Sequence, residues 1–288
     1  MQRLYRKTNI MYLPVLLLFA VFVVYPFFDG IRIAFTNWNG FSRQYDYIGL
    51  ANFGRLFSDP NIRMALLNTL LYGFGSTLFQ QILGLAYALL LDQRFPGRTA
   101  GRTIALLPVF ISAVIMGYMW YFLLQYDGAL NDLALLLGGG KVLWLSDPGL
   151  AKALIISINT LQYVGYSMII YLAGLQSIPA SYLEAARLDG AGSWKCFYRI
   201  TLPLLYPAIV SSVTLNLIGG LKLFDIIRAL TGGGPGYTTH SLTTLLYTSY
   251  FGNQNAGYAA TIGILLFCMI LLVTVLTQWT ARAREVQF

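Results

Sequence analysis

The pattern of hydrophobic and polar positions divides the chain into long apolar stretches separated by short polar links. An α-helix that crosses the hydrocarbon core of a bilayer needs about 20 mostly apolar residues. Six stretches reach that length, at residues 11–31, 64–91, 103–124, 150–175, 203–227 and 256–280. The pattern therefore predicts an all-α integral membrane protein with six transmembrane helices in a single domain, residues 1–288.

The longest polar and charged segment, residues 181–203, lies between the fourth and fifth apolar stretches. Residues 182–188 are good helix formers, and Asp189 and Gly190 supply a stop that tolerates the left-handed region. Ser181 and Glu184 have the spacing of a capping box, and Ser193 is placed to cap a second helix. The segment is thus expected to form two short helices around a glycine turn.

The second of these helices carries an aromatic stripe. Trp194, Phe197 and Tyr198 fall at i, i+3 and i+4, so they share one face, while Lys195 and Arg199 lie off it. Pro203 then falls in the first turn of the next helix, where its missing N–H is tolerated.

Composition supports the membrane assignment. Of the 288 residues, 57% are hydrophobic and 10% charged, whereas soluble domains average roughly a quarter charged. The net charge of +8 therefore points to cytoplasmic loops and phospholipid contact rather than to nucleic acid.

The first apolar run lacks a small-residue cleavage site, so we expect it to be retained as a span. Cys196 and Cys268 fall in a polar loop and an apolar run, and no disulfide is expected.

The distribution of basic residues predicts the orientation. With a cytoplasmic N-terminus, eleven of the nineteen Lys and Arg fall in inner segments, mostly short ones, and four others spread along the outer loop 32–63. This bias favours cytoplasmic N- and C-termini. The eleven are Arg3, Arg6, Lys7, Arg94, Arg98, Arg102, Arg187, Lys195, Arg199, Arg282 and Arg284.

Polar residues concentrate in two of the apolar stretches. Asn159, Tyr163 and Tyr166 lie at i, i+4 and i+7 of the fourth, so they can face one cavity. In the fifth stretch, Asn216 and Gly219 are followed by Lys222 and Asp225. The i, i+3 spacing of this cation and this anion would allow them to pair. Such groups either face a wet cavity or form hydrogen bonds between helices, and the sequence leaves both open.

Other candidate sites are weak. The glycines at 138–140 lack the following Lys-Ser or Lys-Thr of a phosphate-binding loop. The sequence shows no His, Cys and carboxylate cluster for a metal and no interior chain of titratable groups for proton coupling. We expect no catalytic residue and no cofactor. The aromatics of loop 32–63 are expected to form an interfacial belt rather than a ligand site, and His240 is expected to be an ordinary surface residue.

Residues 184–203 resemble the coupling loop of bacterial ABC importer permeases. The pattern is Glu-Ala-Ala, three residues, Gly, nine residues and Ile-x-Leu-Pro, and every position is filled, by Glu184, Ala185, Ala186, Gly190, Ile200, Leu202 and Pro203. A Gly-x-x-Asn element at 128–131, a Trp-x-x-x-Pro element at 144–148 and a Gly-Gly-Pro loop at 233–235 are similar to the maltose-type carbohydrate importers, specifically to the short form of their first permease type. The resemblance covers residues 14–279.

The resemblance implies a set of partners. It predicts a subunit of the bacterial inner membrane that forms half of a pathway with a second, homologous permease. Two cytoplasmic ATPase subunits would supply the energy, and an extracytoplasmic solute-binding protein would deliver a sugar or oligosaccharide. This subunit would not itself hydrolyse ATP.

The resemblance also implies roles for particular residues. Glu184, Ala185, Ala186, Asp189 and Gly190 would belong to the contact with the ATPase. The substrate pathway, carried over by position, would include Ser112, Asn159, Tyr163, Tyr166, Asn216 and Gly219. Lys222 joins this set because it stands where neutral residues are common in the family, which raises an acidic sugar such as a uronide, unless Asp225 neutralises it.

Two other classes stay open. One is an ABC permease for a non-sugar solute, which would have a different outer-loop signature and an ATPase that sugars do not stimulate. The other is a membrane scaffold or enzyme that does not transport, which would have no ATPase partner.

Overall fold

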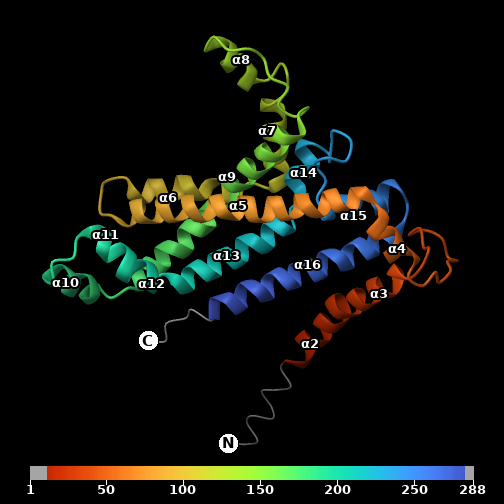
Figure 1. The fold of residues 1–288 in the computed structure, drawn as a ribbon, viewed down its shortest axis with the longest axis horizontal. Helices are drawn as coiled ribbons and strands as arrows, with labels where there is room; N and C mark the ends of the chain where they lie inside the picture. The colour runs from red at the N-terminus through yellow and green to blue at the C-terminus, as the bar shows by residue number, and fades with distance from the viewer. Residues whose placement is uncertain (1–11, 283–288) are drawn as a thin grey trace, which may run out of the picture. The chain divides into compact units, whose positions relative to one another are not determined.

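A computed structural model describes residues 12–282 (Figure 1). Four basic residues of the orientation argument, Arg3, Arg6, Lys7 and Arg284, lie outside this range, and the side chain of Arg282 is not described. The described chain is helical apart from one isolated bridge between Thr36 and Tyr47. It forms two compact units, unit 1 with residues 12–62 and 245–267, and unit 2 with residues 63–244 and 268–282.

Four helices are long and apolar enough to cross a membrane. The first runs from Leu13 to Ala34 through α2 (Leu13–Phe19), η1 (Ala20–Val24) and α3 (Tyr25–Ala34). The others are α5 (Pro60–Asp92), α9 (Pro148–Ser177) and α16 (Ala256–Arg282), which qualifies as far as Trp279. These four agree with the first, second, fourth and sixth predicted spans to within a few residues.

The third and fifth predicted spans are bent. Residues Arg98–Phe110, made of α6 (Arg98–Leu106) and η2 (Leu107–Phe110), meet α7 (Ala113–Leu123) at 94°. Ser193–Leu204 meets α13 (Tyr206–Leu221) at 63°. The first break falls at Ile111 and Ser112, whose backbone is extended with ψ 133° and 136°. The second falls at Leu205, two residues before Pro207, which has no N–H to donate to the carbonyl of Pro203. The described chain has up to six candidate spans if each bent pair counts as one.

The fifth span also ends earlier than predicted. Helix α13 stops at Leu221, Phe224 leaves helical geometry with φ −130° and ψ −60°, and α14 (Asp225–Leu230) begins afresh. Lys222 and Asp225 therefore do not share a helix, and no ion pair joins them in the described part of the chain. The ion pairs among the described residues include Arg32–Asp29 and Lys141–Asp127.

The main apolar core of unit 2 joins α7 and α14 to α5 and α9. Its buried members include Tyr72, Met116, Ile155, Ile226 and Ile227. Helices α7 and α14 approach closely because Gly117 has no side chain, and a Cβ there would lie 2.6 Å from the Cβ of Ala229. This packing holds α14 in place, and so holds the end of the link, residues 222–224, that follows α13.

Unit 1 holds its outer loop by backbone contacts. Helix α4 (Ala51–Ser58) contributes Asn52, whose Nδ2 donates to the carbonyls of Ala34 and Thr36, both at 2.9 Å. The N–H of Gly257 on α16 donates to the carbonyl of Trp38 at 2.9 Å. These contacts hold residues 34–38, where loop 36–47 begins, within its own unit.

Candidate functional site

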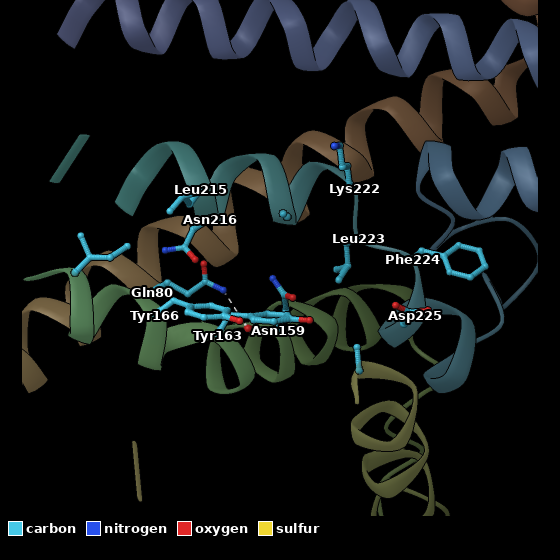
Figure 2. Close-up of a pocket in the computed structure, with 14 residues that line it drawn as sticks. Gln80, Asn159, Tyr163, Tyr166, Leu215, Asn216, Lys222, Leu223, Phe224 and Asp225 are labelled. Atoms are coloured by element: carbon cyan, nitrogen blue, oxygen red, sulfur yellow. Dashed lines mark hydrogen bonds between the residues drawn. The ribbon is translucent and has the colours of Figure 1, made fainter. Parts of the chain in front are cut away.

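Unit 2 contains a cavity of about 420 Å³ (Figure 2). It is bounded by α5, α7, α9 and α13 and by the link from α13 to α14. Its lining residues are Gln80, Ala113, Asn159, Tyr163, Tyr166, Ile170, Leu215, Asn216, Gly219, Gly220, Lys222, Leu223, Phe224 and Asp225.

Most of the predicted pathway residues meet here. Asn159, Tyr163 and Tyr166 line the cavity from α9, and Asn216 and Gly219 line it from α13. A Cβ at Gly219 would meet nothing within 4 Å, so this position faces open space. Ser112 is outside the lining set. It lies at the bend before α7, and its neighbour Ala113 lines the cavity instead.

One side of the cavity is an aromatic platform. The rings of Tyr163 and Tyr166 are stacked, with their centroids 6.1 Å apart and their planes 7° from parallel. The i, i+3 spacing on α9 places both rings on one face of that helix. Two parallel rings offer a flat apolar surface whose hydroxyls remain available for hydrogen bonds.

Amide side chains lie beside this platform. Gln80, which the sequence reading did not select, donates from Nε2 to the backbone carbonyl of Asn159 at 3.1 Å. Its Oε1 is buried without a hydrogen-bond partner among the described residues. Figure 2 shows the side chain of Gln80 between Asn216 and Asn159. Unpaired buried polar atoms are costly, so this oxygen is an acceptor that no described residue uses.

Two charges occupy the opposite end of the cavity lining. Lys222 ends α13 and Asp225 opens α14, and both residues are exposed. The ammonium group of Lys222 points away from the stacked tyrosines in Figure 2. No carboxylate within residues 12–279 lies within ion-pair distance of it.

The segment between α9 and α13 forms the two predicted helices, α10 (Ala180–Leu188) and α11 (Ser193–Cys196), and the latter continues into η3 (Phe197–Thr201) and α12 (Leu202–Leu204). The predicted caps are wrong. Pro179 is the N-cap of α10 and Gly192 that of α11, and neither Ser181 nor Ser193 caps a helix.

The predicted glycine turn is present. Gly190 has φ +77°, and the N–H of Ala191 donates to the carbonyl of Ala186 at 2.9 Å, which closes the end of α10. Glu184, Ala185 and Asp189 are exposed and Ala186 is half-buried. This face of α10 is open to a partner.

His240 is not a surface residue, and that expectation is wrong. It is 5% exposed, its Nδ1 lies 3.0 Å from Oγ1 of Thr244, and Asn68 on α5 donates to its carbonyl at 2.9 Å. Burial, followed by the charge of Arg228, lowers the pKa of the His240 ring. Because Asn68 is 172 residues away, the residues next to His240 in the sequence do not indicate that it is buried.

Comparison with known proteins identifies relatives along nearly the whole chain. Residues 80–286 match the family model of the binding-protein-dependent transport system inner membrane component. A probable ABC transporter permease protein of Pyrococcus horikoshii is 37% identical over 283 residues, 95% of each chain. The trehalose/maltose transport system permease protein MalF of Thermococcus litoralis is 33% identical over 285 residues, covering 98% of this chain and 96% of that one.

A solved structure has a similar fold. It is the bacterial alginate ABC transporter in complex with an alginate pentasaccharide-bound periplasmic protein. One of its chains is 28% identical with a TM-score of 0.85, covering 98% of this chain and 96% of that one. The similarity therefore extends over the bent helices as well as the straight ones.

Proposed function

The chain belongs to the binding-protein-dependent transport system inner membrane components, the permease subunits of ABC importers, and from that membership we propose that it forms half of the translocation pathway for a sugar or oligosaccharide. The membership confirms the family resemblance, the all-helical permease fold and the multi-pass inner-membrane location. The cytoplasmic position of both termini stays a prediction.

The observation that carries the sugar assignment is the aromatic platform beside amides. The stacked rings of Tyr163 and Tyr166 suit the apolar face of a pyranose. The amide side chains of Gln80, Asn159 and Asn216 line the same cavity and are donors and acceptors of the kind that bind hydroxyl groups. A neutral membrane pathway for small apolar solutes would not need this density of amides.

The partners are proposed from family membership. The related structure contains a periplasmic protein that carries a saccharide, which supports a corresponding solute-binding protein here. A second, homologous permease would complete the cavity, which is open in this single chain. Two ATP-binding subunits would supply the free energy, since this chain offers no phosphate-binding loop in its sequence.

Energy would enter through α10. In this proposal Glu184 makes a polar contact with the ATPase, Ala185 and Ala186 allow close packing, and Asp189 and Gly190 form the bend. The segment 178–205 connects α9 directly to α13, and both helices line the cavity. A displacement of α10 that differs between nucleotide states would therefore move two cavity walls as rigid bodies.

Reconstitution tests this proposal. The four kinds of subunit would be assembled in lipid discs, and ATP hydrolysis measured against a panel of neutral and acidic sugars. We expect one sugar to stimulate hydrolysis, and Tyr163→Leu to reduce that stimulation at limiting sugar about tenfold because it removes half of the platform. Tyr118→Leu, on α7 outside the cavity, is the matched control.

The outcomes separate the alternatives. If the ATPase co-purifies but no sugar stimulates it, the permease stands and the sugar assignment falls in favour of another solute. If nothing co-purifies with a folded chain, the coupling role of α10 falls.

A further inference from the structure

The segment between α9 and α13 carries two different surfaces. Helix α10 bears charges of both signs, with Glu184 and Arg187 exposed. The following helical stretch, residues 193–204, has two cations, Lys195 and Arg199, and no acidic residue. The next carboxylate along the chain after Asp189 is Asp225. One element therefore has a mixed charge pattern and its neighbour a purely basic one.

The basic element also exposes aromatic rings. Trp194 is 75% exposed and Tyr198 is 59% exposed, and their rings stack with centroids 5.8 Å apart and planes at 18°. On the inner side Cys196 is buried, and its Sγ lies 3.6 Å from the carbonyl of Ala191. Two members of the aromatic stripe, Trp194 and Tyr198, are therefore exposed, and the third, Phe197, is half-buried.

The bend after this element determines where that face lies. Residues Ser193–Leu204 meet α13 at 63°. A basic stretch with exposed aromatics at such an angle to a crossing helix has the composition of a helix that lies in the membrane interface. Figure 1 shows the turn between α5 and α6 at the same end of unit 2. That turn contains Arg94 and Arg98, which add to the basic character of this end.

We propose that the face formed by Trp194 and Tyr198, flanked by Lys195 and Arg199, binds the headgroups of anionic phospholipids at the membrane–water interface. Tryptophan and tyrosine favour this depth because one edge of the ring is apolar and the other polar. Lys and Arg side chains beside them attract anionic lipid. The lipid contact would hold residues 193–204 while α10 engages the ATPase, so the two surfaces have separate partners.

Site-specific photocrosslinking tests this assignment in the full complex. In one variant a benzophenone side chain would replace Trp194. In the matched control it would replace Tyr182 on α10. The discs would contain phosphatidylcholine with about 30% phosphatidylglycerol. We expect the label at 194 to capture phosphatidylglycerol in preference to phosphatidylcholine, and the label at 182 to capture the ATPase.

A second set of variants tests whether lipid capture depends on the positive charges of Lys195 and Arg199. Lys195→Gln and Arg199→Gln should each lower the capture of phosphatidylglycerol about fivefold, whereas Lys195→Arg should keep it. Gel filtration of each variant complex checks that it still assembles. Arg43→Gln, in loop 36–47 of unit 1, should leave the capture unchanged.

Three results would overturn the proposal. They are capture of the ATPase instead of lipid by the label at 194, equal capture of the two lipids, and unchanged capture in the two Gln variants. Failure of the proposed importer function has a different signature, because then the label at 182 captures no ATPase while capture at 194 can still be read.

Discussion

Asn216 of α13 donates a hydrogen bond from Nδ2 to Oγ of Ser167 on α9, and the two atoms lie 2.6 Å apart. The same hydroxyl accepts from Nε2 of Gln81 on α5 at 3.4 Å, and Oε1 of Gln81 accepts from the hydroxyl of Tyr171. Asn216 also lines the cavity. A polar network thus joins three helices directly behind one wall of the candidate pathway.

Ser167→Ala should destabilise the permease through this network. Hydrogen bonds between membrane helices contribute about 0.6 kcal/mol on average and about 1.7 kcal/mol at most, and Asn216 would keep a long contact to Ser212 at 3.4 Å. We expect a loss of about 1 kcal/mol, measured as a lower melting temperature in detergent. In an Asn216→Leu background the Ser167→Ala change should cost almost nothing. Additive effects of the two changes would mean that the bond does not stabilise the fold.

Gly190→Asp should abolish uptake while the solute-binding protein still binds its sugar. Gly190 has φ +77°, and an added Cβ meets nothing within 4 Å, so the substitution strains the backbone without a clash. Gly192→Asp is the control, because that exposed glycine has φ −70° and equal space. Uptake by Gly190→Asp equal to that of Gly192→Asp would refute the docking role of the turn between α10 and α11.

Gly233→Ala should destabilise the loop between α14 and α15 (Leu242–Tyr247) more than Gly236→Ala does. Both glycines have positive φ, which costs an alanine about 1 kcal/mol. A Cβ at Gly233 would in addition lie 2.2 Å from Cε1 of His240, whereas one at Gly236 meets nothing within 4 Å. Overpacking of this kind adds about 1–3 kcal/mol. Thermal unfolding of the two variants in detergent measures the difference, and equal melting temperatures would contradict the packing argument.

The stability of the same loop should depend on pH. Burial and Arg228 lower the pKa of His240 in the folded chain. As the pH falls below the ordinary value of about 6.5, the unfolded chain binds a proton before the folded chain does. The free energy of unfolding should therefore fall below about pH 6.5 and level off once the folded pKa is passed.

His240→Gln isolates this contribution, because a glutamine amide can still bond to Thr244 and does not titrate near neutral pH. Melting temperatures would be compared between about pH 8 and about pH 5. The wild-type protein should lose more stability than the variant across this range. Parallel curves for the two proteins would assign the pH dependence to other groups.

The length of the apolar runs was enough to predict α5, α9 and α16, because a helix of that length satisfies its own backbone wherever it lies. The bends were not predicted, although Pro108 and Pro203 were visible. A proline can kink, start or end a helix, and the sequence around it does not say which. The end of α13 at Leu221 depends on contacts outside the segment.

Helical periodicity was enough to group Asn159, Tyr163 and Tyr166, and the structure brings all three to one cavity. Gln80 was missed although Ser76, Thr77 and Gln81 lie beside it at helical spacing on α5, because its partner, the carbonyl of Asn159, is 79 residues away. His240 was misassigned for the same reason, since Asn68 lies 172 residues away. Local pattern identifies a face of one helix and does not identify what another helix brings to it.

Lys222→Gln tests whether the transported sugar is acidic. Lys222 lines the cavity without an ion-pair partner in the described part of the chain, so its charge is available to a carboxylate. A hydrogen bond to a charged group contributes about 1.5–3 kcal/mol. We therefore expect Lys222→Gln to raise the sugar concentration for half-maximal uptake of an acidic substrate at least tenfold and to leave a neutral one unchanged. Lys152→Gln, on α9 outside the cavity, is the charge-matched control. Equal uptake of the same acidic sugar by wild type and Lys222→Gln would remove the acidic-substrate hypothesis, and Lys222 would then act through its aliphatic stem at the end of α13.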